Sequence, residues 1–253
     1  MQLNQVKAII TGGASGLGHA VAQFIVANGG KVALFDVNEE KGQEAAKALN
    51  GHFFRTDVTS EEGVSANVTA ARDAMGGLNV VVNCAGILGA GRMLGKEGPM
   101  PLNTFATTMM VNLVGSFNVA KAGAALMQHN ETGEDGERGV IINTASVAAF
   151  EGQIGQAAYS ASKGGVVGMT LPIARDLARN GIRNMTIAPG IFGTPMLFGM
   201  PQEVQDALAA NVPFPSRLGR PEDYAKLVHQ IITNDMLNGE VIRLDGAIRL
   251  APK

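Results

Sequence analysis

Ser146, Tyr159 and Lys163 are the residues of this 253-residue chain whose types and spacing could do chemistry. Lys163 follows Tyr159 by four positions, so on a helix both side chains would share one face. A phenol titrates near ~10, too high for a base at neutral pH, but an ammonium about 4 Å away can lower that pKa by roughly 3 at an effective dielectric of about 20. The phenol could then exchange a proton with an alcohol or a ketone, and Ser146 could hydrogen-bond the same oxygen. Taken alone, Tyr-x-x-x-Lys is also a common surface pattern.

A glycine-rich segment follows the first apolar run directly and opens a helical pattern. A pyrophosphate needs bare backbone N–H groups and a nearby helix N-terminus, and glycines leave that approach open. A tight structural turn is the alternative, but the order strand, turn, helix favours a dinucleotide site. The cofactor residues expected in this turn are Gly12, Ser15, Gly16, Leu17 and Gly18.

Asp36 ends the second apolar run, 18 residues after Gly18. A carboxylate there can accept hydrogen bonds from the adenosine ribose hydroxyls and would repel a 2′-phosphate. The next residues, Val37 and Asn38, carry no positive charge. The sequence therefore predicts NAD rather than NADP as the cofactor.

Short apolar runs alternate with helical patterns along the whole chain. The clearest helix spans 59–75, with Thr59 and Glu62 in capping-box spacing. Strand–helix alternation of this kind predicts a Rossmann-type α/β fold, a doubly wound parallel sheet of about seven strands with helices on both faces, built as a single domain over 1–253. The expected strands are 6–11, 31–35, 52–56, 79–83, 139–144, 183–188 and 240–244.

Ligands of such sheets bind outside the carboxyl ends of the strands, so residues at those ends are expected to contact the cofactor. Cys84 has no second cysteine beside it and is expected to be a small packing residue rather than a redox thiol. The expected contacts after the third and fourth strands are Asp57, Val58, Asn83, Cys84, Ala85 and Gly86.

These motifs, in this order, resemble the short-chain dehydrogenase/reductase family over essentially the whole chain. The resemblance implies that Tyr159 is the acid/base, that Lys163 binds the nicotinamide ribose and lowers the tyrosine pKa, and that Ser146 polarises the substrate oxygen. Asn112 would hold a water linking Lys163 to solvent. The segment implied to contact the nicotinamide contains Pro189, Phe192 and Thr194.

Three stretches, 139–153, 212–219 and 238–249, resemble the branch of that family that acts on 3-hydroxyacyl-CoA in fatty acid metabolism. This implies an NAD-dependent enzyme interconverting 3-hydroxyacyl-CoA and 3-ketoacyl-CoA. A hydroxysteroid or other secondary-alcohol dehydrogenase is the main alternative, and a non-catalytic dinucleotide-binding scaffold a remote one. Gln153 is expected to line the substrate pocket with Ser146 and Tyr159, under a lid formed by 191–215. Arg92 and Lys96 could bind CoA phosphates, or could be ordinary solvated charges.

Composition narrows the remaining classes. A net charge of −2 and a pI of about 6.1 argue against a nucleic-acid partner. No apolar run is long enough to predict a membrane span. One cysteine and four histidines without ligand spacing predict neither a disulfide nor a metal site. We expect a cytoplasmic protein, or a mitochondrial matrix protein if eukaryotic although no presequence is evident. The family resemblance implies a homotetramer built partly from the helices carrying Asn112 and Tyr159.

Overall fold

Seven strands pair side by side in the order β3-β2-β1-β4-β7-β8-β9, and every neighbouring pair is parallel. The computed structural model describes residues 1–96, 98–198 and 201–252. Each strand overlaps the run expected from the sequence, and the doubly wound class is confirmed. The strands are β1 (Lys7–Thr11), β2 (Lys31–Asp36), β3 (His52–Arg55), β4 (Val80–Asn83), β7 (Gly139–Thr144), β8 (Ile182–Pro189) and β9 (Val241–Leu244).

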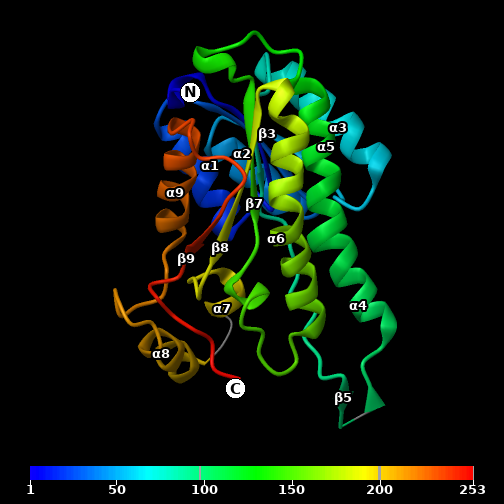
Figure 1. Ribbon diagram of the computed structural model, residues 1–253, viewed down its shortest axis with the longest axis vertical. Coiled ribbons are helices and arrows are strands. Elements are labelled where there is room, and N and C mark those ends of the chain that lie inside the picture. Colours follow the sequence, from blue (N-terminus) through cyan, green and yellow to red (C-terminus); the bar gives the residue numbers. More distant parts are fainter. Residues whose placement is uncertain (97, 199–200, 253) are drawn as a thin grey trace.

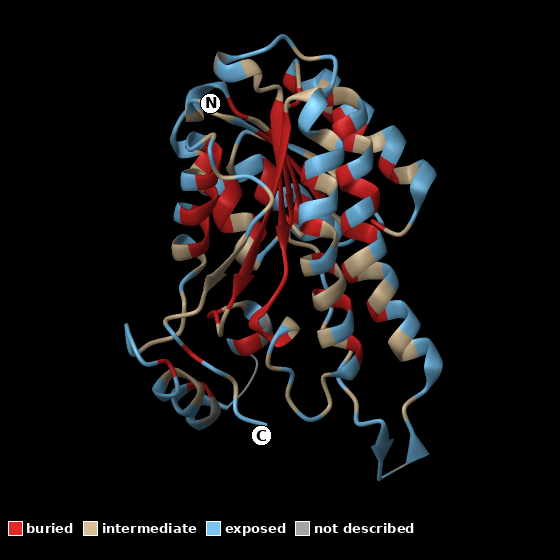
Figure 2. Ribbon diagram, viewed as in Figure 1, coloured by how far each residue is buried: buried red, intermediate tan, exposed pale blue. Residues whose placement is uncertain are grey.

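Helices cover both faces of this sheet, as Figure 1 shows. One apolar cluster joins the sheet to α1, α2 and α9, and another joins the opposite face to α3 and α5. In β1 the buried Ile10 belongs to the first cluster and the buried Ile9 to the second, which explains why the strands show no polar alternation. Figure 2 shows the buried strands between helices whose outer surfaces are exposed. The helices are α1 (Gly16–Ala27), α2 (Glu39–Ala48), α3 (Glu61–Met75), α4 (Leu102–Met109), α5 (Gly115–Met127), α6 (Ala157–Leu177) and α9 (Pro221–Thr233).

The helix expected over 59–75 begins two residues later than predicted. Ser60, not Thr59, is the N-cap, and its hydroxyl accepts a hydrogen bond from the Gly63 N–H at 3.2 Å. Thr59 instead donates its hydroxyl hydrogen to Asp57 at 2.7 Å. Both residues are good caps by type, so local preference alone could not choose between them.

Two segments contain structure that the sequence did not indicate. A short antiparallel hairpin, β5 (Leu94–Gly95) with β6 (Gly98–Pro99), projects from the body before α4 (Figure 1). The segment expected to form a lid, 191–215, contains α7 (Pro195–Phe198) and α8 (Gln202–Ala210). Residues 199–200 of that segment lie outside the described residues.

Candidate active site

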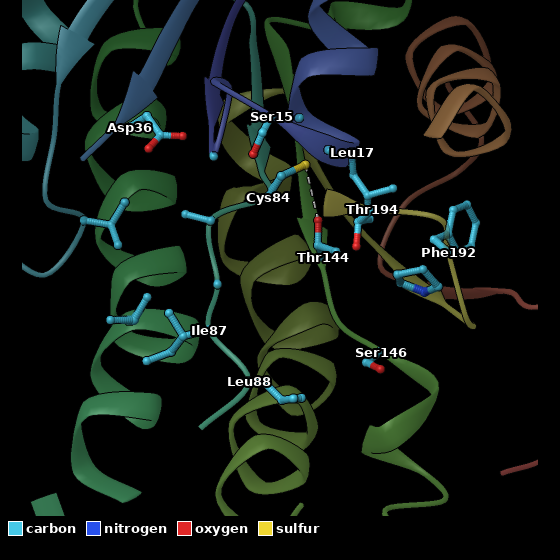
Figure 3. A pocket seen from close by; sticks show the side chains of 18 of the residues that line it. Ser15, Leu17, Asp36, Cys84, Ile87, Leu88, Thr144, Ser146, Phe192 and Thr194 are labelled. Atoms are coloured by element: carbon cyan, nitrogen blue, oxygen red, sulfur yellow. Dashed lines mark hydrogen bonds between the residues drawn. The ribbon is translucent and has the colours of Figure 1, made fainter. Parts of the chain in front are cut away.

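A cavity of about 540 Å³ opens where the carboxyl ends of β1, β2, β4, β7 and β8 meet. It brings together most of the residues expected from the sequence, and Figure 3 shows Asp36, Ser15, Cys84, Ser146 and Thr194 around it. Asn83, Asn112 and Gln153 are not among its lining residues. The expected residues that do line it are Gly12, Ser15, Gly16, Leu17, Gly18, Asp36, Asp57, Val58, Cys84, Ala85, Gly86, Ser146, Tyr159, Lys163, Pro189, Phe192 and Thr194.

The glycine turn forms a bare backbone cradle at the start of α1. Gly12 has a φ of +63°, and a Cβ there would lie 3.0 Å from the Ala85 nitrogen. A Cβ on Gly18 would lie 2.5 Å from the Gly12 carbonyl oxygen, so any side chain would push the turn and helix apart. Ser15, the N-cap of α1, makes no side-chain hydrogen bond to the helix. The N–H groups of the first turn are therefore left for an anion, which fits a dinucleotide pyrophosphate.

Asp36 is held beside this cradle by backbone hydrogen bonds. Its two carboxylate oxygens accept from the Ala14 N–H at 3.2 Å and the Asn38 N–H at 3.0 Å. The neighbouring Val37 is 63% exposed and uncharged. A carboxylate fixed in this place fits the hydroxyl pair of an adenosine ribose and disfavours a phosphate there.

Ser146, Tyr159 and Lys163 meet at the other end of the cavity. Ser146 follows the end of β7 by two residues, while Tyr159 and Lys163 are one turn apart on α6. The pKa of Tyr159 is raised by burial and lowered by a hydrogen bond with Ser146, and the first effect is larger. The Lys163 Nζ lies 5.8 Å from the centre of the tyrosine ring and donates to the Thr144 carbonyl at 2.7 Å, and the expected lowering of the tyrosine pKa by the lysine stays a prediction.

Lys163 is buried, 4% exposed, and burial lowers its pKa to about 8. An unfolded lysine titrates near ~10.4, so between these values the unfolded chain binds a proton that the folded chain does not. The free energy of unfolding should therefore rise as pH rises from about 8 to about 10, and the full cost of the buried charge remains below that window.

We expect this rise to be smaller in Lys163→Met, because methionine fills similar space without titrating. Urea unfolding of both proteins at about one-unit pH steps across the window measures the difference. Parallel curves for the two proteins would contradict the assignment of this titration to Lys163.

Asn112 lies behind the cavity rather than in its wall. It is fully buried in the π-helical turn Met110–Val114, which joins α4 to α5. Its amide accepts from the Ile87 N–H at 2.8 Å and donates to the Ile87 carbonyl at 2.9 Å. A Cβ on Gly86 would lie 3.1 Å from the Asn112 Oδ1 and 3.5 Å from the Lys163 Nζ. Asn112 thus fixes the segment after β4, which passes close to the lysine, and its expected role in holding a water stays a prediction.

Cys84 and Asn83 support the floor of the cavity. The Cys84 thiol accepts a hydrogen bond from the Thr144 hydroxyl at 3.6 Å, drawn as a dashed line in Figure 3, and burial raises its pKa. A half-buried thiol with a raised pKa fits the expected packing role. The Asn83 amide is buried and donates to the Ser116 carbonyl at 3.1 Å and to Asn143 at 2.9 Å. Asn83 therefore ties β4 to its neighbours instead of facing the cavity.

Gln153 does not face the cavity in this structure, because its side-chain amide donates to the Ala251 carbonyl at 2.9 Å. No pattern in the sequence indicated that the C-terminal tail would reach this position. Conversely, some apolar residues that were not predicted from the sequence line the cavity, including Ile87 and Leu88 in Figure 3. Their position directly after the end of the fourth strand is the sequence feature that could have identified them as cavity residues. The further lining residues are Phe35, Val37, Thr56, Ile87, Leu88, Val111, Thr144, Ala145, Gly190 and Pro195.

The described part of the chain also bears on metal binding and on membrane insertion. No group of three or more His, Cys, Asp or Glu side chains there is arranged to hold a metal ion. Among the same residues, no helix combines the length and the hydropathy needed to cross a bilayer.

Comparisons with known proteins show which family has this architecture. A family model described as short chain dehydrogenase matches residues 6–204. The chain is 57% identical over 249 residues to the 3-hydroxyacyl-CoA dehydrogenase type-2 of Bos taurus, covering 97% of this chain and 95% of that protein. The corresponding protein of Homo sapiens is 56% identical with the same coverage. The crystal structure of 3-hydroxyacyl-CoA dehydrogenase type-2 from Mycobacterium avium superposes with a TM-score of 0.92 at 43% identity, covering 98% of this chain and 97% of that one. The chain belongs to the short-chain dehydrogenase family and is an oxidoreductase.

Proposed function

We propose that this oxidoreductase interconverts 3-hydroxyacyl-CoA and 3-ketoacyl-CoA with NAD as cofactor. The observation that carries the proposal is that Ser146, Tyr159 and Lys163 line the same cavity as the glycine cradle and Asp36. The high identity to proteins named 3-hydroxyacyl-CoA dehydrogenase type-2, over nearly their whole length, supports the substrate class.

In this proposal NAD, held by the glycine turn and Asp36, supplies the hydride acceptor. Tyr159 removes the proton of the 3-hydroxyl group as C3 loses its hydride, leaving a ketone. Ser146 donates a hydrogen bond to the same oxygen and holds it against the phenol. Lys163 supplies a buried positive charge that favours the phenolate once the cofactor ribose and substrate occupy the cavity. Reduction runs through the same groups in reverse, with Tyr159 as the acid.

The acyl and CoA ends of the substrate would meet different surfaces. Ile87 and Leu88 line the cavity and offer apolar contact to an acyl chain. Arg92 and Lys96 are exposed on the segment that leads into and through the β5–β6 hairpin, where they could contact phosphates of CoA. A cavity wall this apolar is also compatible with a hydroxysteroid, which is the second candidate substrate.

The test of the substrate class is turnover of NADH with acetoacetyl-CoA, with a 17-ketosteroid and free acetoacetate run in parallel. The proposal expects rapid NADH oxidation with the thioester and at least about 100-fold lower kcat/KM with the other two. Turnover of the ketosteroid alone would transfer the assignment to a hydroxysteroid dehydrogenase. Tight NADH binding without any turnover would support the scaffold.

We also propose that the enzyme is a homotetramer that uses the outer face of α5 and α6. Phe117 on α5 is 47% exposed, and Met110 and Val114 in the π-helical turn that leads into α5 are 42% and 40% exposed. A groove of about 270 Å³ between the two helices is lined by Phe117, Ala120 and Leu177, among others. A second copy could bury these apolar side chains.

The single cysteine, Cys84, is also compatible with the proposed cytoplasmic location.

Phe117→Glu should break this contact, because it places a charge in the centre of the apolar face. We expect the variant to run as a smaller species in light scattering coupled to gel filtration. Met236→Glu changes a side chain that is 92% exposed on the turn before β9 and should leave the mass of the wild type. An unchanged tetramer in Phe117→Glu would rule out this face as the interface.

A further inference from the structure

The loop between β7 and α6 joins two of the three expected catalytic residues. Ser146 begins it, accepting a hydrogen bond from the Ala148 N–H at 3.1 Å, and Tyr159 follows in the first turn of α6. The outer half of this loop has little apolar packing, since Phe150 is 48% exposed and Ile154 is 50% exposed. Other contacts must therefore fix the loop and, with it, the approach of Ser146 to Tyr159.

Those contacts come from the C-terminal tail, which descends from β9 toward the loop (Figure 1). The Ile154 N–H donates to the Pro252 carbonyl at 3.0 Å, and the Gln153 side chain donates to the Ala251 carbonyl at 2.9 Å. The tail is far from the loop in sequence, yet it runs beside the loop for several residues.

An ion pair between Glu151 of the loop and Arg243 of β9 anchors this arrangement. The guanidinium donates to both carboxylate oxygens of Glu151, at 2.7 and 3.0 Å, and its Nε donates to Asp245 at 2.8 Å. It also donates to the Ile248 carbonyl at 3.2 Å and lies 5.2 Å from the centre of the Phe150 ring. The hydrogen bond from Arg243 lowers the pKa of Glu151, so the carboxylate is ionised at neutral pH. A bidentate pair of this geometry is directional as well as attractive.

We propose that Glu151 and Arg243 are positioning residues for the dehydrogenase reaction: by fixing the loop against the C-terminal tail, they hold Ser146 in register with Tyr159. Neither side chain lines the cavity, so they act through the loop and not on substrate or cofactor. The inference rests on the proposed function for its catalytic residues but not on the identity of the substrate.

A double-mutant cycle tests this pair. We expect Glu151→Ala to lower kcat by about 10-fold or more, because small misplacements of reacting groups are costly, while the Kd for NADH changes less than about 2-fold. Arg243→Ala should lower kcat at least as much, since it also frees Ile248. In the double variant the loss of kcat should be smaller than the product of the two single losses, because both changes remove the shared ion pair, although Glu151 also contacts Arg249 at 3.4 Å and the Leu250 N–H at 3.4 Å.

Three controls separate positioning from loss of fold. Rates are normalised to the number of NADH sites titrated, so unfolded protein does not count as slow enzyme. Glu151→Gln keeps the shape of the side chain and should retain an intermediate kcat. Asp73→Ala removes an exposed ion pair with Arg72 on α3 and should leave kcat unchanged.

A normal kcat per NADH site in Glu151→Ala would overturn the inference, as would multiplication of the two single effects in the double variant. Parallel loss of NADH binding and kcat would also overturn it, because the pair would then support the fold in general. The cycle uses whichever ketone the wild type reduces. Failure of acetoacetyl-CoA as a substrate would refute the proposed function while leaving this inference open to the same test.

Discussion

Replacing Tyr159 by phenylalanine should lower kcat by about 10²- to 10⁴-fold, the range that a positioned acid/base contributes. The substitution removes one hydroxyl group and keeps the ring that packs in the cavity wall. The substitution leaves the glycine cradle and Asp36 unchanged, so the Kd for NADH should stay within about 2-fold of the wild-type value. Steady-state turnover and a fluorescence titration with NADH measure the two quantities on the same preparation.

The chain offers a control in its only other tyrosine, Tyr224, which is fully buried. The Tyr224 hydroxyl lies 2.7 Å from the Thr144 hydroxyl, beneath the cavity floor. Tyr224→Phe removes the same atom from a place where no proton transfer is proposed, and we expect a change in kcat of at most a few-fold. Substantial turnover in Tyr159→Phe, or equal losses in both variants, would refute the acid/base assignment.

The second large effect is expected at Asp36, which should determine the choice between NAD and NADP. Replacing it by alanine removes a carboxylate that can bond ribose hydroxyls and repel a phosphate, and Val37→Arg adds a charge that a 2′-phosphate could pair with. A hydrogen bond to a charged group contributes about 1.5–3 kcal/mol, so the two changes together should lower the ratio of kcat/KM for NADH to that for NADPH by at least about 100-fold.

Asp36→Asn separates the two contributions of the carboxylate. Its side-chain oxygen can still accept one of the bonds from the Ala14 and Asn38 N–H groups, but it carries no charge. We expect it to lose part of the NADH preference without gaining strong NADPH turnover. If the ratio of kcat/KM for NADH to that for NADPH is unchanged in Asp36→Ala, in Asp36→Ala combined with Val37→Arg, and in Asp36→Asn, the adenosine ribose binds elsewhere.

Much of the site could be predicted because its residues sit at strand ends, where the fold itself brings them together. The apolar runs placed Thr11, Asp36, Asn83 and Thr144 at the carboxyl ends of parallel strands, and the structure confirms that these ends share one cavity or its floor. The repeating strand–helix pattern sufficed because both faces of the sheet are covered, so each strand reads as a short apolar run without polar alternation.

What could not be predicted depends on tertiary contacts between distant segments. The sequence placed Gln153 at the substrate because of its neighbours, but its partner is Ala251, nearly one hundred positions away. Similarly, the spacing of Tyr159 and Lys163 predicts a shared helix face but not that the Thr144 carbonyl takes the ammonium hydrogen bond. That bond depends on how α6 packs against the end of β7, which no local pattern encodes.

The most direct test of the central claim is a single-turnover experiment. Enzyme saturated with NADH is mixed with excess acetoacetyl-CoA, and the loss of NADH absorbance is followed together with the acyl-CoA product. We expect a rapid loss of NADH absorbance with one 3-hydroxybutyryl-CoA formed per NADH bound, and no such phase in Tyr159→Phe. Bound NADH that persists in the wild type in the presence of the thioester would contradict the proposed function.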